Sequence, residues 1–169
     1  MCIRDRALTE YYYQFHHHQH YYLCHDILEE AWKEKVGYRK TDHVVSLILL
    51  ATGCYHYRRG NIAGGKRSIE KAYTIVKEAE DLTSLGIDKV KYLDMLTQLI
   101  NDMTYQRPFK PVAIPVLPTM HEAILNDYPD YTWCTYVVND AYIRDHHKLR
   151  DRSEVINART DALRARTFK

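Results

Sequence analysis

The spacing of apolar residues along the chain predicts a series of helices. Between residues 18 and 36, apolar positions recur with the period of an amphipathic helix, and Gly37 is expected to end that helix. The next helix is expected to begin at a cap on Thr41 or Asp42 and to run as far as Gly60. It is apolar on nearly every side, which is typical of a helix buried at the centre of a domain.

Local start and stop signals predict two further helices. Gly60 ends the central helix and Asn61 caps the following one, while Asp88 is expected to cap the helix after that. Gly64 and Gly65 fall in the first turn of the helix that Asn61 caps, where each glycine costs roughly 1 kcal/mol relative to alanine. Such a cost indicates that the backbone comes close to a neighbouring helix or to a ligand there.

Helices and prolines divide the chain into four expected parts. Residues 1–6 do not continue the pattern that follows, so we interpret them as a non-native remnant of cloning or sequence assembly and exclude them from the fold argument. Residues 7–106 are expected to form a helical-bundle domain, residues 107–119 a proline-rich extended arm, and residues 120–169 a helical C-terminal extension. The predicted fold class is therefore all-α, a bundle of about four to six helices with this arm and a C-terminal helix.

Composition and charge argue against several classes of protein. Apolar residues make up 46% of the chain and charged residues 27%, and the net charge of +2 gives no general case for a nucleic-acid or membrane partner. The longest apolar run, residues 44–55, falls short of the ~20 residues that span a bilayer. Four cysteines without a C-x-x-C pair, and the lack of a signal peptide, favour a cytoplasmic location.

Tyrosine is unusually frequent, with 15 copies against 3 phenylalanines. Its side chain suits helix interfaces that are apolar in the body and wet at the rim. The same excess would suit a subunit interface, so homo-oligomerisation is an open alternative, and the sequence indicates no other partner.

Two polar residues in the helix over residues 18–36 lie beside its apolar stripe. On a helical wheel Glu29 falls about 40° from His25, so an imidazole and a carboxylate share one flank one turn apart. Polar groups on such a flank need partners. Asp26 falls on the opposite side, and we interpret it as an ordinary surface charge.

A third polar residue, His56, lies on the central helix, and its side chain is expected to point toward packed neighbours. Because consecutive helices usually pack side by side, His25, Glu29 and His56 could converge in one partly buried pocket. Two imidazoles and a carboxylate are the ligands of many catalytic zinc sites, so these residues are candidates both for catalysis and for binding a divalent metal such as zinc. The alternatives are metal-free acid–base chemistry, or a structural cluster that fixes helix packing.

Two other polar groups are interpreted as structural. The run His16–His20 is expected to decorate the surface. Arg58, Arg59 and the glycines after Asn61 could form a phosphate site at a helix N-terminus, but a dipole-compensating last turn followed by a Gly-Asn turn explains them as well.

Two sequence blocks resemble a known family. The run FHHHQHYYLCHDILEEAWKE at residues 15–34 resembles the signature of the domain of unknown function 309 family, in which an aromatic-rich approach precedes H-E-x-L-E-x-x-W. The run GCYHYRRGNIAG at residues 53–64 resembles the Y-H-x-R-x-G-N element of that family. The resemblance implies an all-helical, bacterial cytosolic protein. It carries over six characteristic positions: His25, Glu29, Trp32, His56, Arg59 and Asn61. Asp26 stands where the family usually has glutamate.

The resemblance also implies a candidate function, because members have been labelled as predicted metal-dependent hydrolases. On this hypothesis a metal-bound water is the nucleophile, Glu29 is a ligand or the general base, and Trp32 forms the pocket wall. Arg59 would orient an anionic substrate beside Asn61. The alternative is a non-catalytic scaffold or interaction module, and the sequence leaves open whether the chain is an enzyme.

Overall fold

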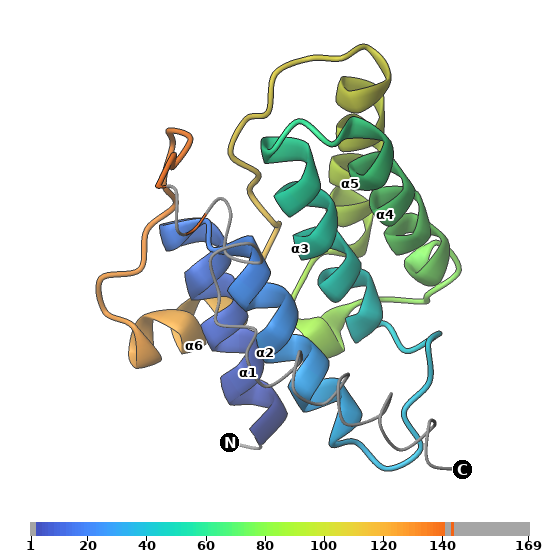
Figure 1. The fold of residues 1–169 in the computed structure, drawn as a ribbon. Coiled ribbons are helices and arrows are strands. Elements are labelled where there is room, and N and C mark those ends of the chain that lie inside the picture. The colour runs from blue at the N-terminus through green and yellow to red at the C-terminus, as the bar shows by residue number, and fades with distance from the viewer. Residues whose placement is uncertain (1–2, 141–142, 144–169) are drawn as a thin grey trace, which may run out of the picture.

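Helix α3 (Val44–Arg58) is the central element of the structure, as its apolar sequence predicts (Figure 1). Leu47, Leu50, Ala51 and Cys54 on this helix have no exposed surface. Helix α2 (Tyr21–Lys33) packs on one side of α3 and helix α4 (Ile62–Val76) on the other. The α3 helix therefore presents only one narrow strip to solvent, between its two neighbours.

The computed structural model describes residues 3–140 and 143 of the 169 residues. This part of the chain is all-α, as predicted, and contains no strand beyond a single isolated bridge between Ile87 and Val116. The remaining helical elements are α1 (Ile3–Tyr13), the π-helical turn η1 (Gln14–His18), the 3₁₀ turn η2 (Thr83–Leu85), α5 (Lys89–Thr104) and α6 (Pro118–Asp127). No described helix is both long enough and apolar enough to cross a membrane.

The glycines in the first turn of α4 allow this helix to lie very close to α3. A Cβ atom placed on Gly65 would lie 3.1 Å from the carbonyl oxygen of Gly53 and 3.3 Å from the backbone nitrogen of Tyr57. A Cβ on Gly53 would lie only 2.4 Å from Cδ1 of Ile69. The helix approach that the sequence predicted at Gly65 is thus confirmed, and the neighbour is a helix.

The caps predicted from local sequence are partly confirmed. The Asn61 side chain accepts a hydrogen bond from the backbone N–H of Gly64, and Asp88 does the same for Lys91. The cap predicted at Thr41 or Asp42 is wrong, because α3 begins after His43 and has no side-chain cap. Asp42 is engaged in the preceding loop instead.

The proline-rich segment lies extended against the bundle. Val112 and Ile114 are buried, and the ring of Phe109 packs edge-on against the rings of Tyr21 and Tyr57 at centroid distances of 5.9 and 5.3 Å. Because proline cannot propagate a helix or a ladder of hydrogen bonds, the segment stays extended until α6 begins at Pro118.

Four tyrosines are completely buried in the core: Tyr11, Tyr12, Tyr21 and Tyr92. The hydroxyls of Tyr11 and Tyr12 donate to the carbonyl oxygens of Leu47 and Leu85, each at 2.7 Å. A buried hydroxyl needs such a partner, and these bonds tie α1 to distant parts of the chain. Much of the tyrosine excess therefore serves the interior of the domain.

The ends of the chain differ in how far the expectations can be compared with the structure. Residues 3–6, which we set apart as a remnant, form the first turn of α1. At the start of the expected helical extension over residues 120–169 the structure has α6, whereas residues 128–140 contain no helix. The rest of that extension falls mostly outside the described residues.

Candidate functional site

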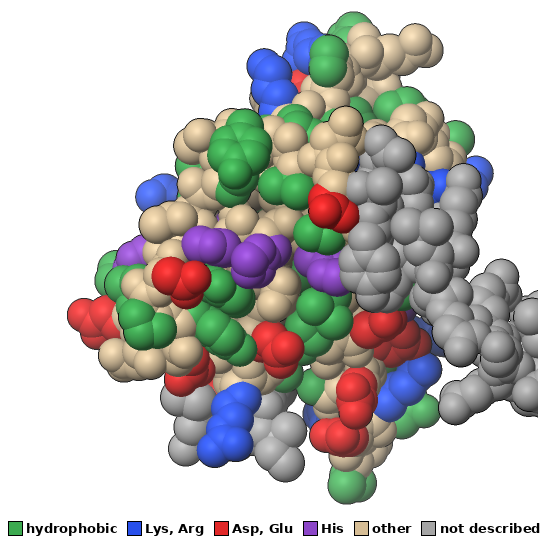
Figure 2. All heavy atoms as spheres, turned by 60° about the vertical axis from the view of Figure 1, so that its left-hand side comes forward, with side chains coloured by type: hydrophobic (Ala, Val, Ile, Leu, Met, Phe, Trp, Pro, Cys, Tyr) green, Lys and Arg blue, Asp and Glu red, His purple; other side chains and the backbone are tan. Residues whose placement is uncertain are grey.

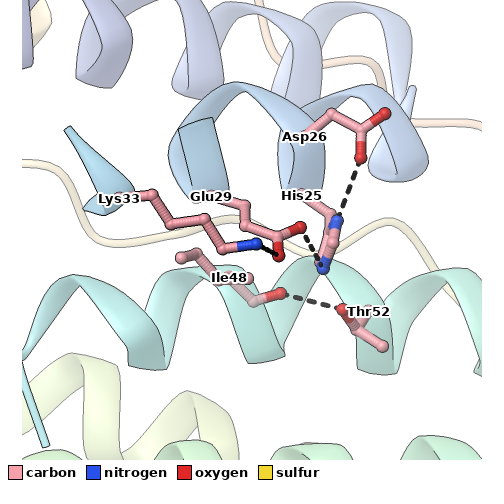
Figure 3. A network of polar contacts seen from close by, with 6 residues as sticks. All are labelled: His25, Asp26, Glu29, Lys33, Ile48 and Thr52. Carbon is pink, nitrogen blue, oxygen red and sulfur yellow. Dashed lines mark hydrogen bonds and ion pairs between the residues drawn. The ribbon is translucent and has the colours of Figure 1, made fainter. Parts of the chain in front are cut away.

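His25 lies on α2 between two carboxylates of the same helix (Figure 3). Its Nδ1 is 3.1 Å from Oδ1 of Asp26, and its Nε2 is 3.5 Å from Oε2 of Glu29. The other oxygen of Glu29 accepts a hydrogen bond from Nζ of Lys33 at 2.6 Å. The result is a row of polar contacts along the surface of α2 from Asp26 through His25 and Glu29 to Lys33, with the imidazole facing Thr52 of α3.

We call His25, Asp26 and Glu29 the His25 cluster. One ligand atom from each residue lies within 4.8 Å of the others, and this is the one such group of three found among the described residues. The side chains of His25 and Glu29 are about one-third exposed, at 31% and 32%, and Asp26 is half exposed. The cluster is therefore open to water. Asp26, interpreted from the wheel as a separate surface charge, is part of it, and His56 is not.

His56 lies at the last turn of α3 and is held by Asn61. Oδ1 of Asn61 accepts from Gly64, so its Nδ2 faces Nδ1 of His56 at 3.2 Å. In this orientation Nδ1 accepts a hydrogen bond and the ring proton resides on Nε2. Partial burial, and then the charges of Arg59 and Arg67, lower the pKa of His56. Both effects favour a neutral imidazole.

Aromatic rings connect these two groups along the α2–α3 surface. The ring of Tyr22 lies 6.4 Å from His25 and 5.5 Å from Tyr55, centroid to centroid. Tyr55 in turn lies 5.9 Å from the ring of His56 and beneath the guanidinium of Arg59 at 5.2 Å. These ring contacts link His25 on α2 to His56 and Arg59 at the end of α3, with the carboxylates beside His25 and the arginine at the opposite end.

Trp32 lies in the last turn of α2, and its side chain contacts the loop between α2 and α3. Its Nε1 donates to the carbonyl oxygen of Arg39 and to Oδ2 of Asp42, both at 3.2 Å. The same carboxylate accepts from the backbone N–H of Arg39, and its other oxygen lies 3.2 Å from Nζ of Lys35. The backbone hydrogen bond from Arg39 is the main cause of the lowered pKa of Asp42. The contacts of Trp32 thus organise this loop.

The surface position predicted for His16 is wrong. Expected on the surface with its neighbours, it is only 3% exposed. Its Nε2 accepts from the backbone N–H of Ile114 at 2.8 Å, and its Nδ1 contacts the hydroxyl of Tyr131 at 2.5 Å. Burial and, to a smaller extent, His121 lower its pKa to about 3. The signal was its position four residues after the buried Tyr12, which continues the apolar stripe of α1.

Other histidines of the run do reach the surface. Histidine side chains gather in a row on the side of the molecule shown in Figure 2. His18 is exposed, and His17 is half-buried with its Nε2 3.8 Å from Asp130. Tyr13 stacks on His17 and donates to the same carboxylate at 2.9 Å.

A groove runs between α3 and α4, next to the strip of α3 that carries Thr52 and His56. It has a volume of about 600 Å³. We call it the α3–α4 groove; its lining residues are Lys40, Val45, Leu49, Arg67, Glu70, Lys71, Thr74 and Ile75. The His25 cluster does not line it.

Two comparisons with known proteins bear on this arrangement. The model of the family described as "Domain of unknown function (DUF309)" matches residues 8–68. The uncharacterized protein YpuF of Bacillus subtilis (strain 168) is 30% identical over 166 residues, which span 95% of this chain and 95% of that protein. The chain belongs to the DUF309 family. No solved structure matches it.

The DUF309 match extends from α1 into the first half of α4. It contains the whole His25 cluster, His56 and Asn61.

The arginine of the Y-H-x-R-x-G-N element corresponds to Arg58 rather than Arg59 when the element is aligned with residues 55–61. This corrects the position carried over from the resemblance. Arg58 points inward: it stacks over the ring of Tyr21 at 4.6 Å and donates to the carbonyl oxygen of Gln19 at 2.7 Å. This arginine therefore joins the end of α3 to the turn before α2.

Proposed function

We propose that the His25 cluster binds a divalent transition metal and that the bound ion supports hydrolysis of an anionic substrate. The observation that carries the proposal is the convergence of an imidazole and two carboxylates within 4.8 Å on a half-open surface. Relative to the predicted set, Asp26 replaces His56 as the third ligand.

The size and chemistry of the cluster support a metal of this kind. Three ligand atoms bound at about 2.1 Å in a tetrahedral arrangement lie about 3.4 Å apart. From separations of up to 4.8 Å the three side chains would have to close by more than an ångström through rotamer changes, which their exposure to water allows. One imidazole with two carboxylates suits zinc, manganese or iron(II). Three protein ligands leave coordination positions for water and substrate.

A divalent ion in such a site lowers the pKa of a coordinated water and polarises a carbonyl or phosphoryl oxygen. The surrounding side chains would supply the rest. Lys33 holds one oxygen of Glu29 at 2.6 Å and leaves the other facing His25. Arg59 lies over the ring of Tyr55, at the far end of the ring contacts that begin at His25, where it would stabilise the negative charge of an extended substrate.

Calorimetric titration of tag-free, chelator-treated protein with Zn²⁺ and Mn²⁺ tests the proposal. We expect one ion per chain, with affinity reduced at least tenfold in His25→Ala, Asp26→Asn and Glu29→Gln. His56→Ala is the matched control and should bind as the unaltered chain does. Lys33→Met should bind a few-fold more tightly, because a cation next to the ligands is removed.

Three results would refute the metal site: unaltered affinity in Asp26→Asn, an equal loss in His56→Ala, or a loss confined to a His17→Asn/His18→Asn double variant. Hydrolysis of nitrophenyl esters and phosphates is then measured with the bound ion. The activity should follow metal occupancy across the same variants. Metal binding without any such activity would support the metal site and refute the hydrolase function.

The α3–α4 groove favours a second function, that of a non-catalytic interaction module. It offers an apolar concavity of about 600 Å³, whereas the His25 cluster lies on an open helix surface. A groove of this kind between two helices is a common way to bind another helix. This function does not depend on the metal proposal.

A further inference from the structure

The floor of the α3–α4 groove is apolar. Val45 and Leu49 lie one turn apart on α3, on the strip of that helix that neither neighbour covers, and Ile75 closes the floor from α4. All three side chains are partly exposed. Over residues 44–51 the remaining residues of α3 are buried, so these three side chains form a defined apolar strip. Farther along the helix Thr52, His56 and Arg58 are partly exposed.

The rim of the groove is basic. Arg67 and Lys71 stand one turn apart on α4, and Lys40 faces the groove from the loop before α3. All three are exposed, and none has an acidic partner within the described part of the chain. Glu70 is the one acidic residue in the lining. The groove therefore carries an excess of two positive charges beside an apolar floor.

We propose that the α3–α4 groove binds an acidic amphipathic helix of a partner protein. The partner helix would place apolar residues at positions i, i+3 or i+4, and i+7 on the floor, and Asp or Glu residues opposite Arg67, Lys71 and Lys40. This inference rests on the interaction-module function and names the chemistry of its partner.

The charges argue against two other occupants. A second copy docking groove to groove would bring two basic rims together, and like charges at a contact oppose association. Nucleic acid would satisfy the rim cations but would leave the floor of Val45, Leu49 and Ile75 against a phosphate backbone, which gains nothing from apolar surface. An acidic amphipathic helix satisfies both parts of the groove.

A selection experiment on the full chain tests the proposal. The probe is a displayed library of 20-residue helices with a fixed apolar stripe and with Lys, Glu or Gln at every other position. Enriched peptides are then measured by fluorescence anisotropy. We expect them to be acidic and to weaken at least tenfold with Leu49→Glu and with the Arg67→Glu/Lys71→Glu double variant. Lys91→Glu, an exposed charge reversal on α5, should have no such effect.

The outcomes separate the partner chemistry from the module itself. Enrichment of neutral or basic peptides that still depend on Leu49 would overturn the acidic partner and keep the module. If the binding of no enriched peptide depends on Leu49, both the acidic partner and the interaction-module function are refuted. Equal binding of a peptide with the same composition and a scrambled stripe would show that charge alone acts, as for nucleic acid. Dimerisation in sedimentation that Leu49→Glu abolishes would make a second copy the occupant.

Discussion

The amide of Asn61 fixes the imidazole of His56. Because Oδ1 of Asn61 is committed to the N–H of Gly64 at 3.1 Å, the amide cannot turn over without losing the cap of α4. Its Nδ2 therefore faces Nδ1 of His56 at 3.2 Å. A helix cap and a histidine tautomer are thus set by one side chain.

Replacing this amide by a carboxylate gives the first prediction. In Asn61→Asp an oxygen can still accept from Gly64, but the second oxygen now faces His56 and favours its protonated form. We expect the pKa of His56, which lies below its ordinary value of about 6.5 in the unaltered chain, to rise by at least one unit.

NMR titration of the histidine resonances measures this change, and the nitrogen shifts should report the proton on Nε2 in the unaltered chain. Asn61→Ala is the control, in which stability falls by about 1 kcal/mol through the lost cap. An unchanged His56 titration in Asn61→Asp would contradict the fixed amide.

The buried His16 predicts a specific loss of stability in acid. Its folded-state pKa of about 3 lies below the unfolded value of about 6.5, so the folded chain binds fewer protons. The stability that it contributes is present above pH 6.5 and is lost as the pH falls toward 3, by up to about 1.4 kcal/mol per pH unit.

Urea unfolding at about pH 7.0, 5.5 and 4.5, which covers roughly the upper two units of this range, measures the loss. His16→Gln can still accept from Ile114 but does not titrate. We expect it to be about 2 kcal/mol less stable at neutral pH, with a shallower decline in acid. Parallel curves for the two proteins would rule out His16 as the group responsible.

The contact between α3 and α4 reverses the usual effect of a glycine-to-alanine change. In an ordinary helix interior Gly→Ala adds roughly 1 kcal/mol of stability. In Gly65→Ala the new methyl group would meet the backbone of α3 at 3.1 Å, so we expect a loss of about 1–3 kcal/mol. Thermal and urea unfolding measure it. Thr74→Ala, at an exposed position of the same helix, should change stability by less than about 0.5 kcal/mol. Stabilisation by Gly65→Ala would refute the close approach.

Two buried tyrosines should respond differently to removal of the hydroxyl. Tyr12 donates to the carbonyl of Leu85 at 2.7 Å, so Tyr12→Phe should cost about 1–2 kcal/mol. The hydroxyl of Tyr21 has no hydrogen-bond partner within the described residues, although it is fully buried. Tyr21→Phe removes this unsatisfied group and keeps the ring under Arg58, so the expected change is neutral or stabilising. Denaturant midpoints compare the two, and an equal loss in both would contradict the assignment.

Local signals in the sequence predicted local features correctly. Asn61 and Asp88 cap their helices through bonds to residues three positions ahead, so the information lies within one turn. Asp42 carries the same signal, but a loop contact with Trp32 and Arg39 claims its carboxylate. The sequence next to a cap residue does not show whether a loop contact will compete for its side chain.

The errors at the candidate site have two causes. A helical wheel assigns Cβ directions and places Asp26 away from His25, but two adjacent side chains can bend toward one another, as Oδ1 and Nδ1 do at 3.1 Å. His56 lies one turn, about 5–6 Å, beyond Thr52, which faces His25, and the sequence does not fix that register between helices. The partners of His16 are even less accessible, because Ile114 and Tyr131 are 98 and 115 residues away.

The bond from Ile114 to His16 also has a consequence for the order of folding. It closes a loop of 98 residues, whereas α2, α3 and α4 pair with immediate neighbours in the chain. Contacts between distant residues pay a larger entropic cost and form late, so the proline-rich segment should dock onto a bundle that already exists. In acid the same segment should detach first, as a partial opening seen by hydrogen exchange at Ile114 before exchange at the core of α3.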